Sequence, residues 1–214
     1  YRLITGKGKF TANIKPSKAL VVKFLRTPIA RGNILSIDIS TAKTLPGVVC
    51  IFTAEDMASD GITHMLDTSN PARDDGGTIV KPRRPILNSY EIKHLGEPVA
   101  MVIAETTEQA DDAIEAINFN YNDSDSAFLS GKDIDSQPVW PEAHDNCASY
   151  HNVGDFSEVE KAEKISAYLI TVPIHISRIT AVAMEPRIAL CETNKKGKSI
   201  FTTSTQNPFA LRAE

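Results

Sequence analysis

Alternating and clustered hydrophobic positions in the first part of the chain predict several β-strands. The stretch KALVVKFLRT predicts a central strand, and the alternation in GNILSIDIS places Leu35, Ile37 and Ile39 on one face, toward the core. VVCIFTA and GEPVAMVIA have the apolar runs that are typical of buried strands. Between these strands, STAKTLPGV predicts a helix of about two turns, because it begins with capping residues and ends at Pro-Gly.

The clearest helix of the sequence is predicted in TTEQADDAIEAINFNY, which also contains a closing strand, INFNY. Thr106 and Gln109 have the spacing of a capping box, in which each side chain accepts a hydrogen bond from the backbone of the other residue. The apolar stripe of this helix consists of Ala110, Ala113, Ile114 and Ile117.

Two stretches have no hydrophobic period and separate the predicted elements. Residues 60–89 are rich in Asp, Gly, Pro and Arg and predict a long exposed excursion, and residues 122–152 predict a linker. Beyond the linker, FSEVEKAEK predicts a short helix, and AYLITVPIHISRI, AMEPRIALCET and SIFTTST predict three strands. The chain therefore reads as two units, of which the second stops just after a helix has begun and is expected to be incomplete.

Composition excludes some classes of function. The 214 residues are 42% hydrophobic, as in an ordinary globular protein. The chain has 23 basic and 27 acidic side chains, with no long block of one sign, and this balance disfavours a nucleic-acid-binding protein. No apolar run approaches the roughly 20 residues of a membrane helix, and no signal peptide is recognisable, so we expect a soluble chain. Three widely separated cysteines, Cys50, Cys147 and Cys191, are a poor disulfide framework and indicate a reducing cytoplasm. Cys50 and Cys191 lie in apolar strand patterns and are expected to be buried thiols.

Several short motifs are weak candidates for binding sites. GKG at Gly6 to Gly8 lacks the rest of a phosphate-binding loop and is more typical of a turn. His144, Cys147 and His151 have the spacing of metal ligands, but no further ligand follows, which favours solvated loop residues. NDSDS lacks the glycine and the distal glutamate of a calcium loop, so a turn is expected there as well.

Two polar side chains in the last part of the chain could carry chemistry. Gln206 follows the strand pattern FTTST and precedes Asn-Pro, so it stands at a strand-to-helix turn. Its amide is either functional or a cap of the following helix. Glu185 interrupts an apolar strand and is either a reactive carboxylate or a bulge residue bonded to backbone; the second reading is favoured.

Six phrases of the chain occur together in one known family. They are LITGKGKFTANI, FLRTPIARGNILSIDISTAKTLPGVVCIFTAEDM, HLGEPVAMVIAETTEQADDAIEAINFNY, NVGD, AMEPRIAL and TTSTQNP. In this order they resemble the large, molybdenum-binding subunits of the xanthine dehydrogenase, aldehyde oxidase and aerobic carbon monoxide dehydrogenase family. The MEPR phrase looks most like the carbon monoxide dehydrogenase and bacterial hydroxylase branch.

This resemblance implies an α+β fold in which an α/β hammerhead domain, residues 1–122, is followed by a linker, 123–152, and by the first strands of a molybdopterin-binding domain, 153–214. It also implies that Gln206 lies beside the molybdenum and donates a hydrogen bond to an oxygen ligand of the metal. No catalytic residue is assigned within the chain, because the family's glycine-rich phrase, substrate pocket and catalytic glutamate would lie beyond Glu214. Glu185 is not taken as the base.

The implied reaction is the oxidation of an aldehyde, an N-heterocycle or carbon monoxide with oxygen from water. The implied cofactors are molybdenum with molybdopterin, in the cytosine dinucleotide form for a bacterial relative, and iron-sulfur clusters and FAD on partner subunits in a dimer of heterotrimers. The chain departs from many relatives at TPIARGN, where Arg31 stands near a position that is often histidine. The alternative is a non-catalytic module that docks other subunits, and the Arg83-Arg84 pair is expected to be solvated or subunit-facing.

Overall fold

The computed structural model divides the chain into two compact units, each of which is described separately below. The larger unit is Ala19–Val153, and the smaller unit combines Tyr1–Lys18 with Gly154–Glu214. The structure describes residues 1–62, 64–65, 73–77, 79–124, 138–143, 146–147, 149–177 and 179–213.

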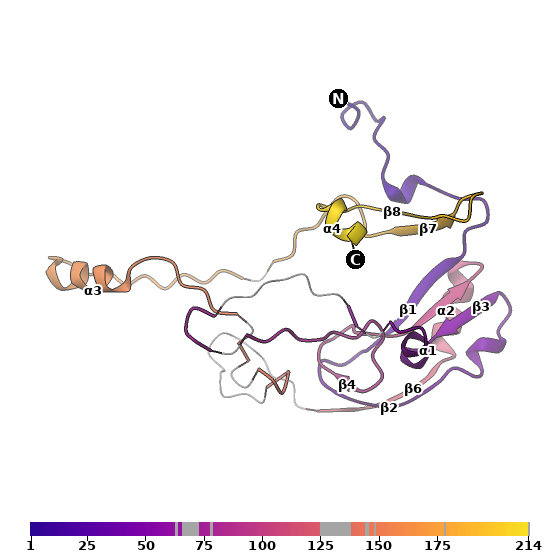
Figure 1. Ribbon diagram of the computed structural model, residues 1–214, viewed down its shortest axis with the longest axis horizontal. Coiled ribbons are helices and arrows are strands. Elements are labelled where there is room, and N and C mark those ends of the chain that lie inside the picture. The colour runs from indigo at the N-terminus through magenta and orange to yellow at the C-terminus, as the bar shows by residue number, and fades with distance from the viewer. Residues whose placement is uncertain are drawn as a thin grey trace. The chain divides into compact units, whose positions relative to one another are not determined.

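One antiparallel sheet of the larger unit has the strand order β1-β5-β3. Figure 1 labels its two outer strands, β1 and β3. Its strands are β1 (Val21–Arg26), β5 (Pro98–Ala104) and β3 (Val48–Phe52). The prediction of a central strand in KALVVKFLRT is wrong, because β1 is an edge strand and β5 occupies the centre. Alternate residues of β1 remain accessible: Val22 is 48% and Phe24 37% exposed.

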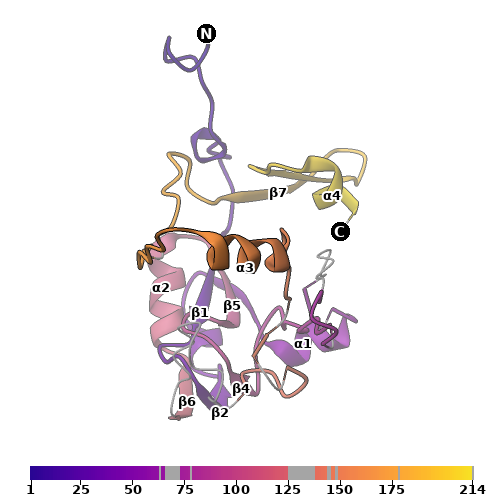
Figure 2. The same cartoon turned by 90° about the vertical axis from the view of Figure 1, so that its left-hand side faces the viewer.

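Helix α2 (Thr107–Glu115) covers one face of this sheet and confirms the strongest helix prediction (Figure 2). The capping box is present: the Gln109 N–H donates to Thr106 Oγ1 over 3.3 Å, and the Thr106 N–H donates to Gln109 Oε1 over 3.0 Å. The core contains the apolar stripe of α2 and alternate residues of β5. The stripe contributes Ala110, Ala113 and Ile117, and β5 contributes Ala100, Val102 and Ala104. Burying one valine or leucine in such a core stabilises it by about 1.5–3 kcal/mol.

The second sheet of the larger unit has the order β4-β2-β6 and contains an irregularity that the alternation did not reveal. Its strands are β2 (Gly32–Asp38), β4 (Glu91–Ile92) and β6 (Asn118–Asp123). The pairing of β2 with β6 shifts between Ile34 and Ser36, so Leu35 is an extra residue and is 65% exposed. The predicted core position of Leu35 is therefore wrong, because a bulge reverses the direction of the side chain.

Two connections between the strands differ from the prediction: the one in STAKTLPGV has a shorter helix, and the excursion 60–89 is more buried. STAKTLPGV forms only a 3-10 turn, η2 (Ala42–Thr44), and AEDMAS forms α1 (Ala54–Ser59). The excursion 60–89 is irregular where it is described, but it is not wholly exposed, because Val80, Leu87 and Asn88 are buried.

The smaller unit contains few packed elements. Its helices are η1 (Thr11–Asn13), α3 (Phe156–Ile165) and α4 (Pro208–Ala213), and β7 (Ala189–Thr193) pairs with β8 (Ser199–Thr203) as a two-stranded ribbon (Figure 1). Asp155 caps α3, since its Oδ1 accepts the N–H groups of Ser157 and Glu158. The bond from the Ser157 hydroxyl and the bond from the Glu158 N–H lower the pKa of Asp155. Cys191 is exposed in β7, contrary to the prediction of a buried thiol, and β7 belongs to a ribbon of only two strands.

The predicted strand AYLITVPIHISRI is not a strand in the described part of the chain. The alternate apolar residues of this segment are highly exposed, among them Tyr168 (89%), Ile170 (82%), Ile174 (80%) and Ile176 (84%). A β-strand requires a neighbouring strand to which it can hydrogen-bond. The alternation of apolar residues by itself therefore did not produce a strand here.

Candidate functional site

Gln206 lies where the sequence predicted, in the short turn between β8 and α4. The neighbouring residues form the helix cap: Asn207 Oδ1 accepts the Ala210 N–H over 3.1 Å, and Thr205 Oγ1 accepts the Asn207 N–H over 3.1 Å. The capping alternative for Gln206 is therefore wrong, because Asn207 performs that role. The Gln206 side chain is exposed and has no hydrogen-bond partner among the described residues.

Glu185 has a structural role in the smaller unit. Its Oε1 accepts the backbone N–H of Thr11 over 2.8 Å, which ties the segment 183–187 to the start of η1. This bond agrees with the reading that Glu185 serves a backbone group, although Glu185 lies outside any strand and therefore does not form a bulge.

The metal-ligand spacing around residue 147 does not produce a shared site in the described part of the chain. Cys147 Sγ donates to the Ser149 carbonyl over 3.2 Å, and His151 Nδ1 lies 2.7 Å from Asp74 Oδ2. His144 lies outside the described residues, as does the second half of NDSDS, whose first two residues end β6. Where the structure describes the chain, no three His, Cys, Asp or Glu side chains are grouped in a way that could hold a metal ion.

Instead, residues 73–77 form an ionic clasp with residues 147 and 149–152 within the larger unit. The guanidinium of Arg73 bonds both carboxylate oxygens of Asp75, over 2.8 and 2.7 Å, and donates to the Cys147 carbonyl over 2.7 Å. Asp74 Oδ2 accepts the N–H of Asn152 over 2.9 Å. The clasp thus holds part of the excursion against part of the predicted linker.

The clasp is expected to open in acid. Hydrogen bonds from Arg73 and from the Gly77 N–H lower the pKa of Asp75 from 3.8 to about 2. A depressed pKa means that this stabilisation is complete above pH 3.8 and is lost as the pH falls through about 2. Hydrogen exchange at Gly77, measured across this range, should show the loss, and Asp75→Asn should abolish its pH dependence. Titration of Asp75 at its ordinary pKa would contradict the prediction.

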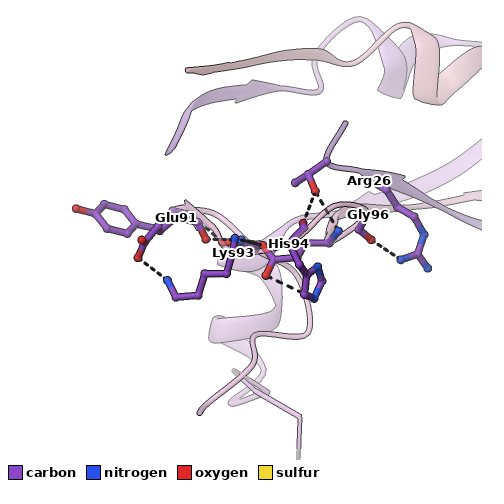
Figure 3. Close-up of polar contacts among 9 residues, drawn as sticks. Arg26, Glu91, Lys93, His94 and Gly96 are labelled. Atoms are coloured by element: carbon purple, nitrogen blue, oxygen red, sulfur yellow. Dashed lines mark hydrogen bonds and ion pairs between the residues drawn. The ribbon is translucent and has the colours of Figure 1, made fainter. Parts of the chain in front are cut away.

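A second polar network, which the sequence did not single out, surrounds the buried carboxylate of Glu97 (Figure 3). Glu97 is 6% exposed, and its Oε2 accepts from Asn88 Nδ2 over 2.5 Å and from the Lys93 N–H over 3.3 Å. His94 Nε2 lies 3.7 Å from Glu97 Oε1. The carboxylate therefore fixes the segment that leads from β4 into β5.

Thr27, at the end of β1, fixes the same segment from the other side. It exchanges backbone hydrogen bonds with Glu97 and Gly96, and its hydroxyl donates to the His94 carbonyl over 3.1 Å. Arg26 adds a bond of 2.8 Å from its guanidinium to the Gly96 carbonyl, as Figure 3 shows. The phrase HLGEP was the sequence signal for this network, since a glutamate directly before a buried strand must find partners.

A pocket of about 360 Å³ lies next to this network, between α1 and the segment 83–97. Met57, Leu87 and Trp140 are among the residues that line it. The volume is within the range of small-molecule sites. Trp140 belongs to the predicted linker, so sequence alone could not place it here.

Comparisons with known proteins agree on one family. Residues 5–125 match the family model described as aldehyde oxidase and xanthine dehydrogenase, a/b hammerhead domain. The chain is 26% identical over 214 residues to the nicotine 6-hydroxylase large subunit of Paenarthrobacter nicotinovorans, a match that covers 99% of this chain and 25% of the relative. It is 23% identical to the nicotinate dehydrogenase large molybdopterin subunit of Eubacterium barkeri, with 99% of this chain and 46% of the relative covered.

Among solved structures, quinoline 2-oxidoreductase from Pseudomonas putida 86 is similar over 99% of this chain and 26% of its own, with 25% identity and a TM-score of 0.75. The chain thus spans between a quarter and a half of the length of the first two curated relatives. In the part of the chain that the structure describes, every helix is too short or too polar to cross a membrane.

Proposed function

Because the chain belongs to the aldehyde oxidase and xanthine dehydrogenase family, we propose that it forms part of the large subunit of a molybdenum-dependent hydroxylase. Within it, residues 1–122 are the hammerhead domain, 123–152 a linker, and 153–214 the start of the molybdopterin-binding domain. The relatives named above act on nicotine, nicotinate and quinoline by their names, which favours an N-heterocycle over an aldehyde or carbon monoxide as the substrate.

The observation that carries this proposal is the free carboxamide of Gln206. Asn207 and Thr205 supply the cap of α4, so Gln206 is not needed to stabilise the turn. Gln206 is exposed, has no partner among the described residues, and follows the end of a strand. Its amide is therefore free to contact a ligand that other parts of a larger protein hold. This free amide supports the proposal that Gln206 contacts the molybdenum cofactor.

The role of Gln206 follows from the chemistry of its amide. A neutral N–H₂ group donates a hydrogen bond to an anionic group without binding the metal as a ligand and without transferring a proton. When bound, the cofactor would supply the hydroxylation itself, in which the substrate carbon takes oxygen from water and two electrons and two protons are removed. Gln206 orients the group that it contacts, and the short turn restricts where its amide can point.

The exposed alternation at 168–176 supports the same proposal. Tyr168, Ile170, Ile174 and Ile176 are each at least 80% exposed, and a segment with this pattern forms a strand only when another strand pairs with it. We propose that further parts of the large subunit supply this neighbour. The electron path would use iron-sulfur clusters and FAD on partner subunits, with molybdopterin cytosine dinucleotide as the pterin.

The proposal is tested by extending the chain to the length of its relatives and by changing Gln206 in that complete subunit. The extended subunit, assembled with its partners, is expected to contain molybdenum and to oxidise an N-heterocycle. Gln206→Ala should lower kcat about 10–100-fold, because it removes a partner beside the metal. Molybdenum content, measured by elemental analysis, should stay unchanged.

Lys195→Ala in the exposed β7–β8 turn is the matched control and should leave kcat and molybdenum content unchanged. Equal activity of Gln206→Ala and the unmodified subunit would contradict the role of Gln206. Absence of molybdenum from the extended subunit would instead favour the docking module.

A further inference from the structure

We propose that the pocket beside Glu97 binds a small aromatic carboxylate, at a site separate from the one that Gln206 would serve. The pocket has a volume of about 360 Å³ and lies wholly within the larger unit. The proposal rests on the shape of the pocket, on its aromatic wall and on the balance of charge among the side chains that line it.

The apolar part of the site suits a flat ring. Met57, Pro85 and Leu87 line the pocket with side chains that contain no nitrogen or oxygen, and the indole of Trp140 also lines it. The ammonium of Lys93 lies 4.9 Å from the centre of the Trp140 ring, which helps to hold the indole in place. A planar ligand could therefore stack or pack edge-on against Trp140.

Among the described residues that line the pocket, one cationic side chain is available. Lys93 is paired with Glu91, as Figure 3 shows, and the carboxylate of Glu97 is engaged by Asn88 and by the Lys93 N–H. Arg83 also lines the pocket, is exposed, and has no hydrogen-bond or ion-pair partner among the described residues.

Arg83 therefore supplies the contact for an anion. A guanidinium binds a carboxylate through two parallel N–H···O bonds, a geometry that fixes the orientation of the ligand as well as its charge. A ligand that carries its carboxylate at one edge of an aromatic ring would place the ring against Trp140 and the carboxylate at Arg83. This complementarity defines the chemical class.

The test uses benzoate as the probe and the fluorescence of Trp140 as the readout, because Trp140 is the only tryptophan of the 214-residue chain. Benzoate should change the fluorescence saturably and should raise the unfolding temperature of the chain. Benzamide, which has the same ring but no charge, should bind about tenfold more weakly. Acetate, which has the charge but no ring, should not saturate.

Two arginine variants provide the matched comparison. Arg83→Gln should weaken benzoate binding about tenfold, whereas Arg84→Gln should leave it unchanged, because Arg84 does not line the pocket. Circular dichroism establishes that each variant folds. Equal affinities for benzoate and benzamide, equal effects of the two variants, or no saturable signal with benzoate would each overturn the proposal. If Arg83→Gln fails to fold, the comparison of benzoate with benzamide on the unmodified chain decides.

Discussion

Glu97→Ala is expected to lower the free energy of unfolding of the larger unit by about 3 kcal/mol. The substitution removes the acceptor for two donors, Asn88 Nδ2 and the Lys93 N–H, in a place where Asn88 is only 4% exposed. A buried donor that loses its partner, as Asn88 Nδ2 would, costs about 1–3 kcal/mol, and the half-buried Lys93 N–H would lose its partner as well. Denaturant titration followed by Trp140 fluorescence measures the change, because Trp140 lies in the same unit.

Glu97→Gln is the control, since it keeps one oxygen that can accept from Asn88. Its cost should be about 1 kcal/mol, the ordinary contribution of one hydrogen bond. The interpretation would be wrong if glutamine and alanine destabilised the unit equally. Hydrogen exchange in the segment 88–97 should increase more for alanine, since the carboxylate holds that segment.

Gly47→Ala should destabilise the larger unit by about 2–3 kcal/mol, for two separate reasons. Gly47 has φ 78°, a conformation that costs a residue with a Cβ about 1–2 kcal/mol. A Cβ at this position would also lie 2.1 Å from the carboxamide of Gln109, so Gln109 must leave its place in the capping box. Loss of a cap costs about 1 kcal/mol more.

Gly61→Ala separates the two contributions. Gly61 has φ 75°, but a Cβ there would meet no atom within 4 Å, so only the backbone cost applies. In the background Gln109→Ala, the Gly47 substitution should lose its additional cost and match Gly61→Ala. Denaturant titration of the four variants gives this comparison. An undiminished effect of Gly47→Ala in that background would contradict the proposed clash.

Local patterns were sufficient where all the required partners are close in sequence. The capping box of Thr106 and Gln109 joins residues three apart, and the stripe of α2 repeats at the period of a helix, so both were correctly predicted. The strand-to-helix turn around Gln206 was predicted for the same reason. Its cap was assigned ambiguously, because Gln206 and Asn207 are adjacent and only coordinates show that Asn207 accepts the Ala210 N–H.

Predictions that depended on distant neighbours were less successful. Leu35 was placed in the core because alternation cannot reveal a bulge, which depends on the register of β2 against β6. The alternation at 168–176 predicted a strand, but a strand also needs a partner that no local pattern supplies. The role of Gln206 beside molybdenum remains a prediction, since it concerns groups outside this chain.

The sequence by itself determined helices α2 and α3, most strands and the family, because the periodicity, the capping residues and each matching phrase lie in short stretches of neighbouring residues. Only the tertiary structure decided that Glu97 is buried among Thr27, Asn88 and the Lys93 backbone, and that Trp140 stands beside Met57 and Arg83. Thr27 and Glu97 are 70 positions apart in the chain, and Met57 and Trp140 are 83 positions apart. Their proximity arises from the packing of whole elements, which no short stretch of sequence encodes.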